Sequence, residues 1–328
     1  MGPLKGIKVL EFSGIGPGPY CGMLLADMGA DVIRVNRIND KDKQNKFDIH
    51  NRSKRSIVAD LKNPNSINEL LKLISSVDVV FEGFRPGVME KLGLGPDECF
   101  KQNKALVYGR MTGWGQTGPL ANAAGHDINY IALSGALAAI GRDDSPPVPP
   151  LNLIGDFGGG GMLLALGIVA ALLETKNSGK GQVIDAAMVD GTASLMAMFF
   201  SFAAGGGFSD QRGTNMLDGG APFYDTYETA DGKAICIGSI EPQFYALLKE
   251  KAELPEERFG NQMDTSQWPA LKEELAAIFK TKSQDEWCTL MEGTDVCFAP
   301  VLSIFEAPDH PHNKARNSFY EVDGVMQQ

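Results

Sequence analysis

A histidine and an aspartate are the first candidates for chemistry, because each stands at the start of an expected helix. His126 lies in AGHDINYIALSGAL, before an expected helix over residues 128–140. Asp156 lies in NLIGDFGGGGM, before four glycines and an expected helix over residues 159–174. An imidazole and a carboxyl group can serve together as general acid and general base. Simpler roles remain open, since Asp127 or Asp156 could cap its helix and a single histidine is often structural.

Basic residues gather near the ends of expected strands, where open sheets commonly bind ligands. The stretch NRSKRSIVADLK over residues 51–62 is rich in cations, and Arg85 follows another expected strand in FEGFRPG. The cations of the first stretch are Arg52, Lys54, Arg55 and Lys62. Such side chains can bind phosphates through charge-assisted hydrogen bonds, although a solvated surface would have the same composition.

Net charge limits the class of ligand. The chain carries −11 overall, which argues against nucleic acid as a partner. Residues 1–62 hold 11 basic and 7 acidic side chains, a balance of +4, whereas the remainder carries −15. A basic region on an acidic protein favours an anionic ligand.

The loop SGIGPGPYCG over residues 13–22 invites comparison with the dinucleotide-binding fingerprint. Gly14 and Gly16 fit its first two glycines, but Pro19 occupies the third position, where close helix packing is needed. The next expected strand ends at Asn36 and Arg37, without an acid for a ribose hydroxyl. Nicotinamide binding is therefore disfavoured. A ligand cleft and a simple tight turn both remain open.

The elements that position these residues alternate between strand and helix. Expected strands cover residues 7–12, 31–35, 56–59, 77–81, 105–111 and 182–186, and further expected helices cover 18–28 and 64–75. Such alternation predicts an α/β fold with a large, open-sheet, Rossmann-like domain.

A second, smaller domain is expected after a glycine-rich boundary. Residues 205–207 and the loop LDGGAP over 217–222 read as linker. Residues 223–228 and 233–238 flank an Asp–Gly turn and predict a hairpin, and helices are expected over 242–251, 268–280 and 283–291. We therefore predict a large α/β domain over 1–204, a linker over 205–222, a small α+β domain over 223–303 and a return linker over 304–328.

Neither a membrane span nor a metal site is expected. The longest apolar run, residues 162–173, falls short of the roughly 20 residues that a span requires, and no export signal precedes the first strand. Five cysteines are scattered without metal-ligand spacing, as in a reducing compartment. We expect a cytoplasmic protein, or a peroxisomal or mitochondrial one in a eukaryote. The chain ends without an SKL-type address.

Long segments in the same order resemble the α-methylacyl-CoA racemases of the family III CoA-transferase superfamily. They include EFSGIGPGP, LLADMGADVIRV, KRSIVADLK, EGFRPGVMEKLGLGP, RMTGWGQTGP, AGHDINYIALSGAL, LNLIGDFGGGGM, GQVIDAAMVDG, LDGGAPFYDTY, IEPQFY and EAPDHPH. The resemblance covers nearly the whole chain. Members of this family usually continue for a few dozen residues beyond the segment matching HPHNKAR, so we expect the final segment to be missing, shortened or removed.

This resemblance implies roles for particular residues. His126 and Asp156 would exchange the α-proton from opposite sides, supported by Glu241 in IEPQFY. An interlocked homodimer is implied, with Glu241 contributed by the partner chain and no cofactor beyond the coenzyme A of the substrate. The implied coenzyme A contacts are Arg37, Ala59, Asp60, Leu61, Lys62, Gly125, Asp127, Ile128, Asn129 and Tyr130, with Arg85 added by similarity to the related transferases.

The expected function is interconversion of (R)- and (S)-2-methylacyl-CoA thioesters through an enolate. Adaptable methionines could line the acyl tail's surface, although ordinary core packing is the favoured explanation for each. Those candidates are Met188, Met196, Met198 and Met216. The alternative is a CoA-transferase that uses Asp156 as nucleophile, and a second alternative is a catalytically silent acyl-CoA-binding protein. His126 favours the racemase, because the transferases of the superfamily generally lack a histidine there.

Overall fold

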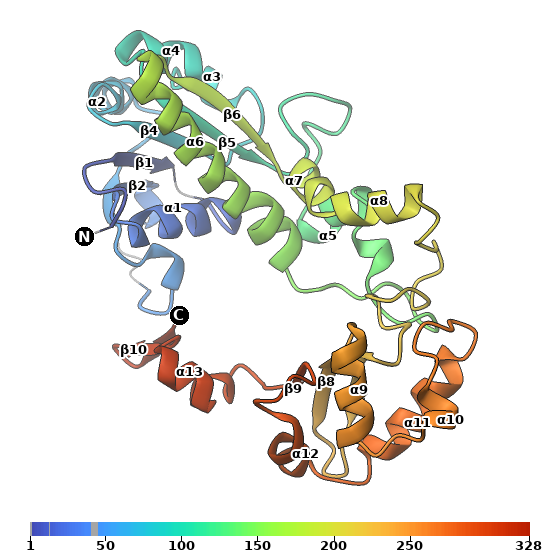
Figure 1. The fold of residues 1–328 in the computed structure, drawn as a ribbon. Coiled ribbons are helices and arrows are strands. Elements are labelled where there is room, and N and C mark those ends of the chain that lie inside the picture. Colours follow the sequence, from blue (N-terminus) through green and yellow to red (C-terminus); the bar gives the residue numbers. More distant parts are fainter. Residues whose placement is uncertain (1, 13, 41–44) are drawn as a thin grey trace. The chain divides into compact units, whose positions relative to one another are not determined.

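The chain folds into two compact units. A computed structural model describes residues 2–12, 14–40 and 45–328 (Figure 1). The first unit comprises residues 1–137 and 149–201, and the second comprises 138–148 and 202–328. The sequence assigned all of residues 1–204 to the large domain, whereas segment 138–148 groups with the second unit.

A six-stranded parallel sheet forms the centre of the first unit, in the order β3-β2-β1-β4-β5-β6. Its strands are β1 (Lys8–Phe12), β2 (Asp31–Asn36), β3 (Arg55–Val58), β4 (Val79–Glu82), β5 (Val107–Thr112) and β6 (Gln182–Ala187). This is the order of a doubly wound Rossmann sheet, so the predicted fold class is confirmed. Strand order reverses between β1 and β4, and ligands bind in such sheets at the carboxyl ends of the strands beside that reversal.

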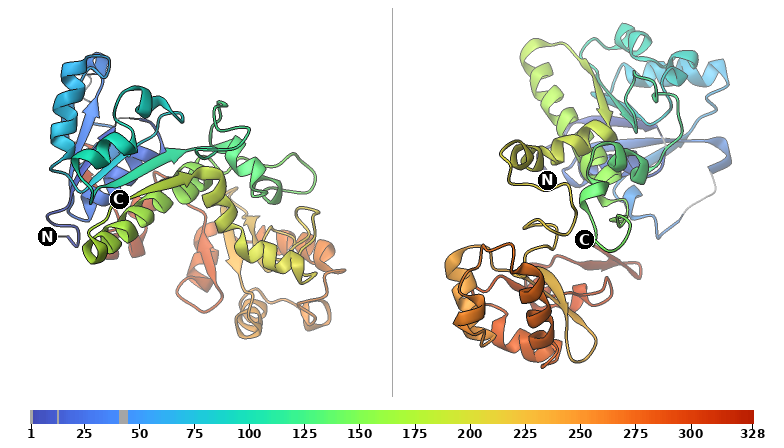
Figure 2. Two further views of the ribbon diagram at one scale, coloured as in Figure 1. Left: turned by 90° about the horizontal axis from the view of Figure 1, so that it is seen from above. Right: turned by 90° about the vertical axis from the view of Figure 1, so that its right-hand side faces the viewer.

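Helices cover both faces of this sheet (Figures 1 and 2). Successive residues of β1 point to opposite faces: Val9 packs with helices α1 and α6, and Leu10 packs with α2 and α4. The helices of the unit are α1 (Pro17–Asp27), α2 (Pro64–Ile74), α3 (Val88–Lys91), α4 (Pro96–Gln102), α5 (Asp127–Leu133), α6 (Leu163–Ser178), α7 (Met188–Leu195) and α8 (Ala197–Ala204), with short 3-10 turns at Ile38–Asp40, Ile49–Asn51 and Leu137–Ala139. The last three residues of α8 belong to the second unit.

Two predicted helices have different bounds in the structure. The helix expected over 128–140 ends at Leu133, because Gly135 adopts a left-handed backbone conformation with φ +87° that a helix cannot continue through. The helix expected over 159–174 begins earlier: a π-helical segment, η4 (Leu153–Met162), leads directly into α6. Asp156 therefore lies inside a helical segment and does not cap one.

The glycine run of η4 allows close helix packing. A Cβ on Gly159 would lie 2.6 Å from the backbone nitrogen of Thr192 on α7, and a Cβ on Gly161 would lie 2.7 Å from the carbonyl oxygen of Pro17 on α1. Distances below about 3 Å are not tolerated between such atoms. The glycines thus let η4 lie between α1 and α7, which fixes the turn that carries Asp156.

The continuous helical segment Leu153–Ser178 is long and apolar enough to cross a membrane, by length and composition. Leu164 and Ile168 on one side of it are fully buried in the core of the first unit. A buried core helix can be as long and as apolar as a membrane span, so this segment by itself is weak evidence for a membrane span. Met162, Leu166 and Leu173 on the other side are exposed.

The second unit contains an antiparallel sheet with helices on one face. Its strands are β7 (Tyr224–Glu228), β8 (Ala234–Gly238) and β9 (Phe298–Pro300), and its helices are α9 (Pro242–Lys251), α10 (Glu256–Phe259), α11 (Trp268–Phe279) and α12 (Gln284–Met291). The predicted hairpin is present as β7–β8. The segment 304–328, expected as a return linker, contains a 3-10 turn (Ala307–Asp309), α13 (Pro311–Arg316) and a small hairpin of β10 (Tyr320–Val322) and β11 (Val325–Gln327).

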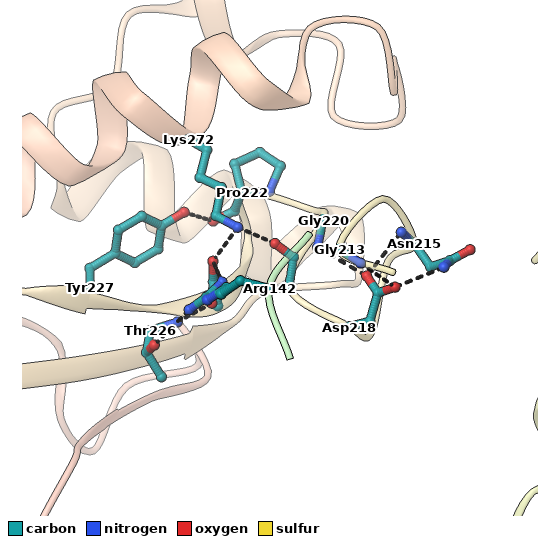
Figure 3. Close-up of polar contacts among 11 residues, drawn as sticks. Arg142, Gly213, Asn215, Asp218, Gly220, Pro222, Thr226, Tyr227 and Lys272 are labelled. Atoms are coloured by element: carbon teal, nitrogen blue, oxygen red, sulfur yellow. Dashed lines mark hydrogen bonds and ion pairs between the residues drawn. The ribbon is translucent and has the colours of Figure 1, made fainter. Parts of the chain in front are cut away.

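Charged side chains hold segment 138–148 in the second unit (Figure 3). Arg142 pairs with the buried carboxylate of Asp225 at 2.7 Å, and Lys272 pairs with the same carboxylate at 2.5 Å. Arg212 donates hydrogen bonds to the carbonyl oxygens of Ala138 and Arg142. Burial alone would raise the pKa of Asp225, but the hydrogen bonds from Arg142 and Lys272 outweigh it and lower that pKa.

Candidate active site

A cavity of about 810 Å³ opens in the first unit at the carboxyl ends of β1, β4 and β5. The loops that follow these strands line it: residues 14–16 after β1, residues 83–86 after β4, and residues 113–114 after β5. This is the reversal point of the sheet, where an open α/β sheet is expected to bind its ligand. Ser13, in the first of these loops, lies outside the described residues.

Both predicted acid–base residues line this cavity. His126 is exposed and stands directly before α5, and Asp156 is half-buried inside η4. His126, not Asp127, is the N-cap residue of α5, and it forms a capping box with Asn129, whose side-chain oxygen accepts the backbone N–H of His126 at 3.0 Å. The fold thus brings together an imidazole and a carboxyl group that are 30 residues apart in the sequence.

Two further residues surround the Asp156 carboxylate. The side-chain nitrogen of Asn152 donates a hydrogen bond to Oδ2 of Asp156 at 3.0 Å. Gly16, in the loop after β1, has φ +67°, and a Cβ on it would lie 3.0 Å from the same oxygen. Sequence reasoning missed both contacts, although the four-residue spacing of Asn152 and Asp156 corresponds to about one helical turn and could have indicated the first.

Asp127 turns toward η4. Its carboxylate accepts the backbone N–H of Asp156 at 2.6 Å, and its side chain is buried. Burial raises the pKa of Asp127, and the charge of Asp156 raises it further, against the backbone N–H groups of Asp156 and Gly155, which lower it. The predicted coenzyme A contact is thus also a support for Asp156.

Arg37 and Arg85 are the cations that line the cavity. Both are exposed, and within the described ranges neither forms an ion pair. Three neighbouring cations of the 51–62 stretch are paired elsewhere. Those pairs are Arg52 with Asp27, Lys54 with Glu11 and Arg55 with Asp31. Arg37 and Arg85 are therefore better candidates for contact with phosphates than these three residues.

Two of the remaining predicted coenzyme A contacts line the cavity. Gly125 and Tyr130 line it, and the ring of Tyr130 packs edge-to-face against Trp114 with centroids 4.8 Å apart. Ala59 donates its backbone N–H to the carbonyl oxygen of Asn36, which places residues 59–62 beside Arg37. Those not among the lining residues are Ala59, Asp60, Leu61, Lys62, Asp127, Ile128 and Asn129. Of the four methionines considered, Met188 lines the cavity.

Glu82 adds a titratable group to the cavity wall that the sequence did not single out. Its buried carboxylate accepts the backbone N–H of Phe84 at 2.6 Å and lies 3.3 Å from Arg110, which also pairs with Glu90. Burial raises the pKa of Glu82 to about 7, against the lowering effects of the Phe84 N–H and Arg110. Glu82 thus connects β4 to the loop that carries Arg85.

Glu241 belongs to the second unit, where it directly precedes α9. Its side chain is exposed and makes no hydrogen bond or ion pair within the part of the chain that the structure describes. Across those same residues, no group of three or more His, Cys, Asp or Glu side chains is arranged to hold a metal ion.

Comparison with known proteins identifies the family. Residues 4–327 match the model of CoA-transferase family III. The alpha-methylacyl-CoA racemases of Mus musculus and Homo sapiens are each 49% identical to this chain, over 96% of it and 82% of their own length. A crystal structure of a CaiB/BaiF family protein from Brucella suis has a TM-score of 0.84 at 28% identity, covering 99% of this chain and 90% of that protein. The chain belongs to CoA-transferase family III.

Proposed function

We infer that this protein is a racemase that interconverts (R)- and (S)-2-methylacyl-CoA thioesters by moving one proton at the α-carbon. One observation carries this inference: His126 and Asp156 line a single cavity together with two arginines, Arg37 and Arg85. An acid–base pair beside cations fits a substrate that has an acidic carbon next to a phosphorylated carrier.

The α-proton of a thioester is only weakly acidic. Its pKa lies roughly 13 units above that of a base that works near neutral pH, so its removal is uphill by roughly 18 kcal/mol. The protein must therefore stabilise the enolate with fixed donors. We propose that a first-turn N–H of α5 serves this purpose, because the first N–H groups of a helix have no partner inside it. The backbone N–H of Asp156 is already bonded to Asp127.

Two acid–base groups allow inversion in both directions. In one direction neutral His126 removes the α-proton and protonated Asp156 returns one to the opposite face; in the other direction the roles are exchanged. We propose that Glu241 orients and stabilises the imidazolium form of His126, as a carboxylate does beside histidine in other enzymes. Arg37 and Arg85 bind the phosphates of the coenzyme A.

The alternative is a CoA-transferase in which Asp156 attacks the thioester and forms an acyl anhydride. Such a mechanism needs an acid acceptor for the coenzyme A and gives no role to a histidine in the cavity. His126 and the 49% identity to two racemases favour the racemase.

The direct test supplies one enantiomer of a 2-methylacyl-CoA in deuterated water, without an added acid acceptor. Inversion accompanied by deuterium at the α-carbon is the expected result. If no deuterium enters at the α-carbon and the thioester changes only when an added free acid accepts its coenzyme A, the transferase is correct and the racemase is not.

Substitutions separate the roles of the cavity residues. His126→Ala is expected to lower turnover at least 100-fold with little change in coenzyme A binding, since general acid–base groups contribute about 10²–10⁴-fold. Arg37→Ala is expected chiefly to raise KM. His312→Ala, an exposed histidine on α13, is the matched control and should leave both constants unchanged.

We also propose a homodimer, a cytoplasmic location and a reaction without a cofactor. The exposed apolar side of α6 offers a surface for a second copy. Unpaired cysteines at all five positions suit a reducing compartment. If no metal takes part, dialysis against a chelator should leave the inversion rate within twofold of its original value; loss of activity that added metal restores would exclude that proposal.

A further inference from the structure

Asp127 connects the two elements that carry the acid–base residues. It is the first residue of α5 and follows His126 directly. Its Oδ1 accepts the backbone N–H of Asp156 in η4 at 2.6 Å. One side chain thus spans 29 residues of sequence, from the helix start at His126 to the π-helical turn at Asp156.

The surroundings of this carboxylate leave it little freedom. Only 6% of Asp127 is exposed, and its Oδ2 is buried without a hydrogen-bond partner among the described residues. A Cβ on Gly155 would lie 2.5 Å from Oδ1 and 3.1 Å from Ile131. Position 155 therefore accommodates only glycine if the carboxylate is to reach the η4 backbone.

A buried carboxylate is costly unless hydrogen bonds compensate for its lost water. The buried carboxylate of Asp127 carries this cost in free energy, although an apolar side chain could fill the same space beside the cavity. It does not cap its own helix, because His126 is the N-cap residue and Asn129 completes the capping box. The hydrogen bond to Asp156 is the contact that distinguishes a carboxyl group from an apolar side chain at this position.

We propose, on the basis of the racemase function inferred above, that Asp127 is a positioning residue for proton transfer. Its carboxylate sets the spacing between His126 and Asp156, so that both reach the same carbon from opposite faces. Displacement of a reacting group by about 1 Å can lower a rate about 100-fold. Asp127 itself exchanges no proton with the substrate.

Two variants of Asp127 test this role in the full-length protein. Asp127→Asn keeps an oxygen that accepts the Asp156 N–H, so kcat should stay within about threefold of the original. Asp127→Ala removes that acceptor, so kcat for inversion should fall about 30- to 1000-fold while KM stays within about threefold.

Deuterium exchange identifies which base has moved. In Asp127→Ala, the enantiomer whose proton faces His126 should still exchange its α-proton with deuterated water, whereas exchange of the other enantiomer should fall together with inversion. Gly155→Ala gives an independent route to the same result, because its methyl group displaces the carboxylate without removing it. It serves as the test if Asp127→Ala does not fold.

Asp185 provides the matched control. Its carboxylate also accepts a backbone N–H, that of Gln116 at 3.0 Å, but it does not line the cavity. Asp185→Ala should leave kcat unchanged. Unchanged inversion in Asp127→Ala, equal loss of exchange for both enantiomers, or loss in Asp127→Asn as severe as in the alanine variant would overturn the proposal. Absence of inversion in the unsubstituted protein would instead overturn the racemase function itself.

Discussion

Gly16 leaves room for the carboxylate of Asp156 because glycine has no Cβ. Its backbone has φ +67°, and a Cβ would lie 3.0 Å from Oδ2 of Asp156. Gly16→Ala should therefore lower the unfolding free energy by about 1–3 kcal/mol and turnover by at least tenfold. Denaturant unfolding and the inversion assay measure these effects.

Gly18→Ala is the matched control for this substitution. A Cβ on Gly18 meets no atom within 4 Å, and its φ is ordinary. Alanine within α1 should leave stability equal or slightly higher, because alanine has the greater helix propensity. Equal behaviour of the two variants would contradict the assigned role of Gly16.

Glu82 predicts a pH dependence of stability. Its folded pKa of about 7 lies above the ordinary value of 4.5, so it stabilises the folded state in its protonated form, and that contribution is lost as pH rises through 7. Arg110 and Tyr108 lie beside it, and because the pKa of each is raised above its ordinary value, both retain their charge states over that range. Between pH 5 and pH 8, the unfolding free energy of the original protein should fall by about 1–3 kcal/mol relative to that of Glu82→Gln.

Denaturant titrations at the two pH values provide this comparison, because the difference between the two proteins removes the titration of all other groups. A constant difference across the range would show that Glu82 does not titrate there. A difference of opposite sign would show that its ion pair with Arg110 outweighs burial.

At the residue scale, the sequence indicated the reacting groups but not their supports. His126 and Asp156 stand beside recognisable glycine and helix signals, so their segments could be found from pattern. The contact from Asp127 to Asp156 and the close approach of Gly16 depend on chain folding over 29 and 140 residues. No local spacing encodes contacts of that kind.

At the element scale, the glycine run of η4 determines how closely three helices pack. Gly159→Ala would place a methyl group 2.6 Å from the Thr192 nitrogen, a backbone atom that cannot turn aside. Overpacking of this kind costs about 1–3 kcal/mol, so the thermal unfolding midpoint should fall. In Gly158→Ala the nearest atoms to the new Cβ would lie 3.2 Å and 3.3 Å away, so the thermal unfolding midpoint should fall clearly less. The reverse order would contradict the packing role.

The strands of the first unit were predictable because apolar runs between turn signals reveal buried parallel strands. The helices near the cavity were not predicted with the right bounds. Gly135 ends α5 through a left-handed conformation that glycine adopts optionally, and the π-helical start of η4 places Asp156 within a turn of a kind that is rare and that often occurs at functional sites. Tertiary packing decided both bounds.

At the scale of the whole molecule, the exposed side of α6 predicts association. Met162 at the end of η4, together with Leu166 and Leu173 on α6, leaves apolar surface uncovered along this side. Leu166→Glu should weaken the proposed dimer, so that light scattering coupled to size exclusion detects monomer at micromolar concentration. Lys176→Glu, an exposed change near the end of the same helix, is the control. A monomeric original protein would exclude the dimer.

The grouping of residues 138–148 with the second unit limits how the chain can be divided genetically. The polypeptide passes from one unit to the other after residues 137, 148 and 201, so no single cut yields both units whole. A fragment that began at residue 202 would lack Arg142 and leave the Asp225 carboxylate, 5% exposed, with Lys272 as its one remaining cation from those described. To isolate an intact second unit, the eleven residues 138–148 would have to be joined to residues 202–328 by an engineered linker.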